Sequence, residues 1–262
     1  MREHDRTLLL DTIREAGALA RRYFENGAKA WNKAKGDPIT EADLAVDGLI
    51  KARIGTARPE DGWLSEESRD DPKRLSARRL WIVDPIDGTI AFIKKRPHFT
   101  VSMALIEAGV PVLGAVLNPM LDELFEAELG GGARLNGAPI EVSAQPTIEG
   151  CRILGPRDLF AYPGWPEPWP PSMQIENRNS IAYRLALVAA GRFDAMLALS
   201  RKREWDVAAG DLILREAGGC ITTHKGEILR YNQPDPFVPS LVGAGPQLHK
   251  AILGKVHQLA LG

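Results

Sequence analysis

The chain has 262 residues, of which 44% are hydrophobic and 26% charged, and its 33 basic and 34 acidic residues leave a net charge of -1. This balance excludes the strong overall field of a protein built to bind nucleic acid or an anionic membrane, so we expect neither as a partner. Two cysteines argue against a disulfide framework, and no apolar stretch approaches the ~20 residues that span a bilayer. Because the charged residues 1–6 precede only a short apolar run, we expect no signal peptide and a cytoplasmic location.

The first part of the chain predicts two helices joined by a loop. Residues 5–26 place apolar side chains at helical spacing and are followed by Gly27, which predicts an amphipathic packing helix. Gly, Asp and Pro mark residues 33–39 as a loop. A second helix is predicted over about residues 41–54; its candidate core positions are Leu44, Val46, Leu49 and Ile50.

Acids follow this loop and the next predicted strand. Thr40 and Asp43 have the spacing of a capping box, in which Asp43 would also favour the helix dipole, so its role is structural or chemical. Residues 63–65 predict a short strand that ends at Glu66 and Glu67. Adjacent like charges repel, so these two acids belong either to a solvated loop or to a site that supplies a cation.

The segment around which the chain is organised is an apolar run, residues 80–83, that ends in Asp84-Pro-Ile-Asp87-Gly88-Thr89. The run predicts a buried strand that stops at a loop. Proline stiffens the backbone between the two acids, and Gly88 lets the main chain approach a ligand closely. Two fixed carboxylates beside backbone N–H groups suit a hard divalent cation together with a phosphate, although Asp-Pro and Asp-Gly also form plain turns.

The middle of the chain predicts strands and loops. Three cations, residues 94–96, follow the central segment, and residues 99–135 predict an antiparallel meander closed by an Asn136-Gly137 turn. Residues 155–171 are rich in Pro, Gly and Trp and predict an irregular loop that is a peptide-binding surface, a substrate flap or a plain surface loop. A buried helix over residues 181–190 and a strand over 193–199 follow.

The last acid of interest is Asp206. We expect it to be the N-cap of a helix that ends at Gly218-Gly219, and an N-cap carboxylate can also face a metal. Small side chains at residues 208–210 would let the start of this helix lie close against another segment.

Glu66, Asp84, Asp87 and Asp206 each lie at a predicted strand end or helix start. Such positions can converge at one edge of a layered α/β fold, where ligands bind. Oxygen donors without a Cys or His cluster favour Mg²⁺ or Mn²⁺ over Zn²⁺, and this much negative charge calls for two or more ions. No nucleophile motif occurs, so attack by a metal-activated water is favoured over a covalent intermediate.

Four collinear motifs, with a fifth short piece after them, resemble the inositol monophosphatase family across nearly the whole chain; they are residues 37–43, 65–68, 81–89, 205–210 and 216–219. This family comprises Mg-dependent, lithium-sensitive phosphatases and includes 3′(2′),5′-bisphosphate nucleotidases. The resemblance implies an α/β protein with an αβαβα sandwich of the sugar-phosphatase type. Because members of the family are commonly homodimers, it also implies a homodimer. It implies a phosphomonoesterase that hydrolyses a small phosphorylated metabolite.

The resemblance also implies a role for individual residues. Two or three Mg²⁺ ions, or Mn²⁺, would be held by Glu66, Asp84, Asp87, Asp206 and the main-chain carbonyl of Ile86. The catalytic residues would be Thr89, Asp43 and Glu66, with Thr89 and Asp43 positioning the attacking water. Gly88, Thr89 and Asp206 would bind phosphate or substrate, and Glu67 would lie behind the metal ligands. We expect one compact catalytic unit, with residues 1–145 carrying the antiparallel sheet and residues 146–262 contributing Asp206.

The sequence departs from the family pattern seven residues before Asp206. Inositol-specific members tend to have a glutamate there that contacts sugar hydroxyls, whereas this chain has Leu199. Cations follow at residues 201–203, in addition to those at 94–96, and they either face solvent or bind a second phosphate. A bisphosphate nucleotidase acting on 3′-phosphoadenosine 5′-phosphate is therefore an alternative. A non-catalytic regulatory protein that keeps the fold is a second alternative, disfavoured because no acid of the metal set is missing.

Overall fold

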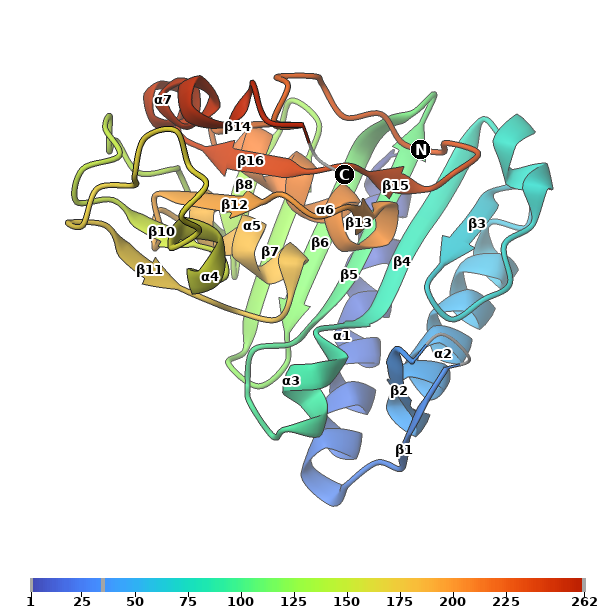
Figure 1. The fold of residues 1–262 in the computed structure, drawn as a ribbon. Coiled ribbons are helices and arrows are strands. Elements are labelled where there is room, and N and C mark those ends of the chain that lie inside the picture. Colours follow the sequence, from blue (N-terminus) through green and yellow to red (C-terminus); the bar gives the residue numbers. More distant parts are fainter. Residues whose placement is uncertain (1, 34–35, 261–262) are drawn as a thin grey trace.

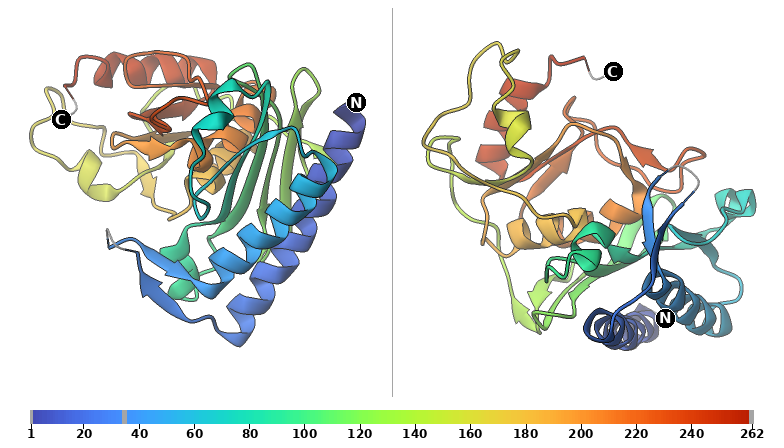
Figure 2. Two further views of the ribbon diagram at one scale, coloured as in Figure 1. Left: turned by 90° about the vertical axis from the view of Figure 1, so that its right-hand side faces the viewer. Right: turned by 60° about the horizontal axis from the view of Figure 1, so that its bottom comes forward.

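The computed structural model describes residues 2–33 and 36–260, which stack in five layers, α–β–α–β–α (Figures 1 and 2). Helices α1 (Arg2–Asn26) and α2 (Glu41–Ala57) cover one face of a seven-stranded sheet. Helices α5 (Ile181–Ala189) and α6 (Glu204–Glu216) lie between this sheet and a five-stranded one, whose outer face packs on α7 (Pro246–Val256). The αβαβα architecture expected from the sequence is confirmed.

The large sheet has the strand order β3-β4-β5-β6-β7-β8-β9. Its strands are β3 (Gly62–Ser65), β4 (Arg79–Asp87), β5 (Thr100–Glu107), β6 (Val110–Asn118), β7 (Glu123–Glu128), β8 (Gly132–Leu135) and β9 (Ala138–Pro139). Only the β3–β4 pair of this sheet is parallel, so the predicted meander is confirmed. Asn136 and Gly137 have φ of 50° and 81°, which is the backbone of the hairpin turn that Asn-Gly favours.

The small sheet has the strand order β11-β10-β12-β16-β14. Its strands are β10 (Arg152–Leu154), β11 (Gln174–Glu176), β12 (Ala195–Ala198), β14 (Cys220–Thr222) and β16 (Leu241–Ala244). Two short antiparallel pairs complete the described strands: β1 (Ala30–Asn32) with β2 (Pro38–Thr40), and β13 (Lys202–Arg203) with β15 (Phe237–Val238). Short helical turns are η1 (Pro72–Ser76), α3 (Thr89–Ile93) and α4 (Arg157–Phe160).

Strand β4 divides its side chains between the two faces of the large sheet. Leu80 and Ile82 pack in the core with α5 and α6, whereas Trp81 and Val83 pack in the core with α1 and α2. This is the two-residue alternation of a strand that is buried on both faces. Each fully buried aliphatic side chain here contributes about 1.5–3 kcal/mol, so the strand that carries the central acids is held firmly from both sides.

The second helix is longer than predicted and presents a different face. It extends three residues beyond Ile54, and its Leu44 is 47% exposed rather than buried. Ala42, Val46 and Ile50 are buried at intervals of four residues, which is one face of a helix. Because Leu44 lies two residues, about 200°, from both Ala42 and Val46, it points to solvent.

Helix α6 begins earlier than the sequence suggested, so the prediction that Asp206 is its N-cap is wrong. The N-cap is Arg203, and Asp206 occupies the third helical position, where its carboxylate accepts the Arg203 N–H at 3.0 Å. Glu204 starts the helix because its buried carboxylate accepts the N–H groups of Asn232 and Gln233 at 2.8 and 2.9 Å. Asp206 therefore still faces out of the first turn.

The small side chains of α6 serve close packing, as predicted. A Cβ on Gly210 would lie 2.7 Å from the Cβ of Leu185 in α5, so the two central helices pack backbone against side chain.

Within the described part of the chain, no helix is long and apolar enough to cross a membrane.

Candidate active site

Asp84 and Asp87 point to the same side of the large sheet although they are three residues apart. In a regular strand an odd separation places side chains on opposite faces. The pairing of β4 with β5 shifts register between these two residues, and Ile86 packs on the α1–α2 side. This bulge turns Asp87 back towards α5, where Asp84 also faces α6. The strand therefore extends to Asp87, beyond Val83, where the sequence predicted its end.

Pro85 is tolerated at this irregular point because the ladder is already interrupted there. The Asp84 carboxylate accepts the Ile86 N–H at 3.0 Å, which closes a local turn around the proline. Gly88 follows with φ of 100°, and a Cβ there would lie 3.2 Å from the Ser180 nitrogen and the His98 carbonyl oxygen. Only glycine fits this close approach of the two chain segments.

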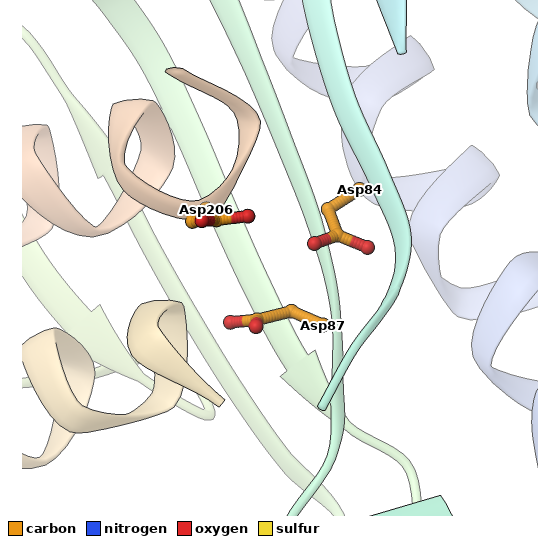
Figure 3. Close-up of side chains that lie close together, drawn as sticks. All are labelled: Asp84, Asp87 and Asp206. Atoms are coloured by element: carbon orange, nitrogen blue, oxygen red, sulfur yellow. The ribbon is translucent and has the colours of Figure 1, made fainter. Parts of the chain in front are cut away.

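Asp84, Asp87 and Asp206 form a cluster of facing carboxylates (Figure 3). One oxygen of each lies within 4.8 Å of the others, with Asp84 and Asp87 buried and Asp206 partly exposed. Figure 3 shows the side chains converging from β4 and from the first turn of α6. They line a cavity of about 220 Å³ that is also bordered by Glu66, Gly88 and Thr89.

The surroundings of these acids disfavour their charged forms. Burial raises the pKa of Asp84 well above its ordinary value, and the nearby carboxylates of Glu66, Asp87 and Asp206 raise it further. Burial likewise raises the pKa of Asp206. Burial raises the pKa of Asp87 to about 6 even though the Ser180 hydroxyl and the Ala182 N–H donate to its carboxylate. Facing carboxylates in such a site need protons or cations as compensation, and an oxygen-only donor set fits a hard cation such as Mg²⁺.

Asp43 has both the structural contacts and a contact in the site. Its Oδ2 accepts the Thr40 N–H at 2.8 Å and the Thr40 hydroxyl at 2.5 Å, which completes the predicted capping box of α2. Its Oδ1 lies 3.2 Å from the Thr89 Oγ1, which lies equally far from the Ile86 carbonyl oxygen. Burial raises the pKa of Asp43. One residue thus begins α2 and reaches the first turn of α3.

Glu66 and Glu67 lie immediately after β3 and share one cation. The Lys33 ammonium contacts Glu66 at 2.9 Å and Glu67 at 2.7 Å. Burial raises the pKa of Glu67 to about 7, against the opposing effect of Lys33. The cation that adjacent acids require was not identified from the sequence, because Lys33 arrives from the β1–β2 hairpin. Lys33 preceding a Gly-Asp-Pro loop was the available signal.

The basic residues singled out in the sequence divide sharply in the structure. Lys95 donates to the Phe24 carbonyl oxygen at the end of α1, and Arg201 pairs with Asp235 at 2.8 Å. Arg203 stacks over Phe237, 3.6 Å from the ring centre. Lys202 alone of these four is within electrostatic reach of Asp87 and Asp206, although burial lowers its own pKa.

Residues 1–261 match the inositol monophosphatase family. The chain belongs to this family. An inositol-1-monophosphatase from Rhizobium meliloti (strain 1021) is 34% identical over 229 residues, 84% of this chain and 85% of that protein. A histidinol-phosphatase from Chlorobaculum parvum is 34% identical over 234 residues, 85% of this chain and 86% of that protein. The crystal structure of extragenic suppressor protein suhB from Bartonella henselae has a TM-score of 0.83 at 30% identity, covering 97% of this chain and 98% of that one.

These matches confirm the resemblance to the inositol monophosphatase family. The chain is a phosphatase of that family, and the names of its relatives point to more than one phosphate ester among the family's substrates.

Proposed function

We propose that the protein is a Mg²⁺-dependent phosphomonoesterase that hydrolyses a small phosphorylated metabolite by direct attack of water. The observation that carries this proposal is the convergence of Asp84, Asp87 and Asp206 within 4.8 Å in a cavity that Gly88 and Thr89 also border. Carboxylates suited to a hard cation lie there beside Gly88 and Thr89, whose main-chain N–H groups we assign to a phosphate.

We assign the cation sites to the three facing aspartates, to Glu66 and to the main-chain carbonyl of Ile86. Two or three Mg²⁺ ions, or Mn²⁺ in their place, suit this number of acids. Bound Mg²⁺ supplies charge that stabilises the phosphoryl oxygens and lowers the pKa of water. Because Asp84 and Asp87 are set by a bulge in a strand buried on both faces, their oxygens need little rearrangement to receive the ions.

Thr89 and Asp43 are the residues that we assign to the attacking water. The Thr89 hydroxyl lies 3.2 Å from Asp43 Oδ1, so it can accept a hydrogen bond from water while its own proton is directed to Asp43. The raised pKa of Asp43 makes this carboxylate a better proton acceptor than an exposed aspartate. The N–H groups of Gly88 and Thr89 and the Asp206 carboxylate orient the phosphate ester, and Glu67 with Lys33 holds Glu66 in place.

A bisphosphate nucleotidase acting on 3′-phosphoadenosine 5′-phosphate is the second candidate. It is favoured by Leu199, which offers no oxygen to a sugar hydroxyl, and by Lys202, whose ammonium lies in electrostatic reach of the acids. A lysine at this place pairs with a second phosphate. The completeness of the acid cluster argues against a non-catalytic relative.

We expect the protein to form a homodimer and to be inhibited by lithium, because members of this family commonly have both properties.

The deciding experiment measures phosphate release by the purified protein with Mg²⁺ and with excess EDTA. The panel contains inositol 1-phosphate, histidinol phosphate, β-glycerophosphate and 3′-phosphoadenosine 5′-phosphate. We expect turnover with Mg²⁺ that is lost with EDTA and restored by added Mg²⁺. Turnover that chelation leaves unchanged, or no turnover of any ester, would contradict the proposal.

A further inference from the structure

Three cavities follow one another from the acid cluster to the Pro- and Trp-rich segment, residues 155–171. The cavity at the acids shares Asn179 and Ile181 with a second cavity of about 500 Å³. The second shares Leu159 and Leu199 with a third of about 450 Å³. Because neighbouring cavities share wall residues, they adjoin one another in a row that extends well beyond the space that a phosphate needs.

The second cavity is cationic. It is lined by Lys202, whose ammonium donates to the Ser200 Oγ at 2.6 Å, and by Arg184 from α5. Burial lowers the pKa of Arg184 to about 10, and its guanidinium donates to the Asn177 side chain at 2.7 Å. A cation beside an acid cluster, in a cavity that reaches that cluster, suits an anionic group on the substrate and disfavours a cationic one.

The third cavity is apolar and aromatic. Its walls include Tyr162 and Trp165 from the Pro- and Trp-rich segment, together with Leu159, Leu199 and Leu259. Most residues of this segment are exposed, but it carries the one-turn helix α4 and buries Trp169 in the core under α7.

Trp165 is held in place in the wall of the third cavity. The indole N–H of Trp165 donates to the Leu159 carbonyl oxygen at 2.7 Å, and its ring meets Trp169 edge to face at 5.3 Å. Tyr162 lies over Gly164, where a Cβ would come within 2.3 Å of the tyrosine ring. Opposite, the Leu259 carbonyl accepts from the Lys225 ammonium at 2.8 Å. Trp165 is thus in position before a ligand arrives, which lowers the entropic cost of binding, whereas Tyr162 is 61% exposed and would be covered by a ring stacked on it.

We propose that Tyr162 and Trp165 form a specificity pocket for a flat aromatic ring of the substrate, such as a nucleobase. The inference rests on the proposed function and identifies its substrate class: a nucleoside phosphate whose ester lies at the acids, whose second anionic group pairs with Lys202 and whose base stacks in the third cavity. Aromatic walls bind the π-face of any base. A small cyclic polyol has no aromatic ring to stack there.

The test compares kcat/KM for 3′-phosphoadenosine 5′-phosphate with kcat/KM for its base-free analogue, ribose 3,5-bisphosphate. The wild-type protein prefers the nucleotide, and Y162A and W165A each lower this preference about tenfold, the effect of one lost stacking contact. W165F retains most of the preference because it keeps a ring. Ile228 is 76% exposed and outside the three cavities, so I228A is the control and changes neither value.

Calorimetric titration of the nucleotide, with Mg²⁺ present, separates the two levels of the argument. If no ester is hydrolysed but the nucleotide binds and Y162A weakens its binding, the pocket stands and the phosphatase proposal fails. If esters are hydrolysed but the wild type treats the two bisphosphates alike, the pocket is wrong. It is equally wrong if Y162A and W165A leave the preference intact while their melting temperatures match the wild type.

Discussion

The Ser180 hydroxyl donates to the Asp87 Oδ2 at 2.7 Å and so joins the N-cap of α5 to the end of β4. The Ser180 Oγ also accepts the Tyr183 N–H at 2.9 Å, as an N-cap side chain does. A second donor, the Ala182 N–H, reaches the Asp87 carboxylate at 2.6 Å. The first turn of the central helix therefore orients one member of the acid cluster.

This contact predicts a dual effect of S180A. Loss of the N-cap destabilises the protein by about 1 kcal/mol, and loss of the orienting hydrogen bond weakens Mg²⁺ binding by about tenfold or more. Urea denaturation measures the first effect, and the Mg²⁺ concentration for half-maximal activity measures the second. S180T keeps the hydroxyl and retains most of both. Equal Mg²⁺ dependence in S180A and the wild type would refute the orienting role.

Thr89 supplies a prediction that isolates proton handling from folding. T89A removes the hydroxyl that contacts Asp43 and that we assign to the attacking water, so we expect kcat to fall by ~10²–10⁴ with little change in KM. T89S keeps the hydroxyl and stays close to the wild type. Steady-state kinetics of the three proteins with one ester provide the comparison, and comparable kcat values for T89A and T89S would exclude this role.

Much of the fold was predictable because local rules and tertiary contacts agree. The buried strand at residues 80–83, the Asn136-Gly137 turn and the Thr40–Asp43 capping box each follow from a few neighbouring residues, and the structure has all three. The start of α6 was misplaced because Asp206 is as favourable at the third helical position as at the N-cap. What decided between them is the contact of Glu204 with residues 232 and 233, which are distant in sequence.

The sequence predicted that acids at the ends of separate elements converge, but it did not predict the contacts that hold them in place. Asp84, Asp87 and Asp206 converge as their places at element ends suggested. The bulge that turns Asp87, and the pairing of Lys33 with Glu66, depend on long-range geometry that no local pattern encodes. The row of adjoining cavities from Asn179 to residues 155–171 likewise exists only in the folded chain.

The raised pKa values predict how stability depends on pH without metal. In the unfolded chain an aspartate titrates near 4, whereas in the folded protein Asp87 titrates at about 6. Because the folded state then holds the proton more tightly, stability from this group is present below about pH 4 and is lost as the pH rises past 6, by about 3 kcal/mol. In EDTA, the free energy of unfolding therefore falls less steeply between pH 4.5 and 7.5 in D87N than in the wild type. If the free energy of unfolding fell equally with pH in both proteins, Asp87 would not be the group whose raised pKa causes the loss.

We expect Mg²⁺ to reverse this trend, because the proposed ions would bind the charged carboxylates. The rise in melting temperature on adding Mg²⁺ is therefore larger at pH 7.5 than at pH 5, where protons compete for Asp87 and its neighbours. Scanning calorimetry at the two pH values measures the rise in melting temperature. The control replaces Mg²⁺ with NaCl, free of Ca²⁺, at equal ionic strength. A rise of the same size at both pH values would mean that Mg²⁺ binds elsewhere.

D87N removes the charge of a proposed metal ligand and should leave the core intact, because the amide oxygen can still accept from Ser180 and Ala182. We expect a folded protein whose turnover is lower by at least two orders of magnitude. Circular dichroism and phosphate release report the two properties separately. Turnover close to that of the wild type would show that Asp87 is not a ligand.

The central claim is that acids from separate elements hold divalent cations, and crystals grown with Mn²⁺ test it most directly. We expect anomalous density peaks in the cavity between the carboxylates of Glu66, Asp84, Asp87 and Asp206, with oxygen contacts close to 2.2 Å. The same crystals of D87N lose at least one peak. An active protein whose Mn²⁺ density lies away from these four carboxylates would contradict the account.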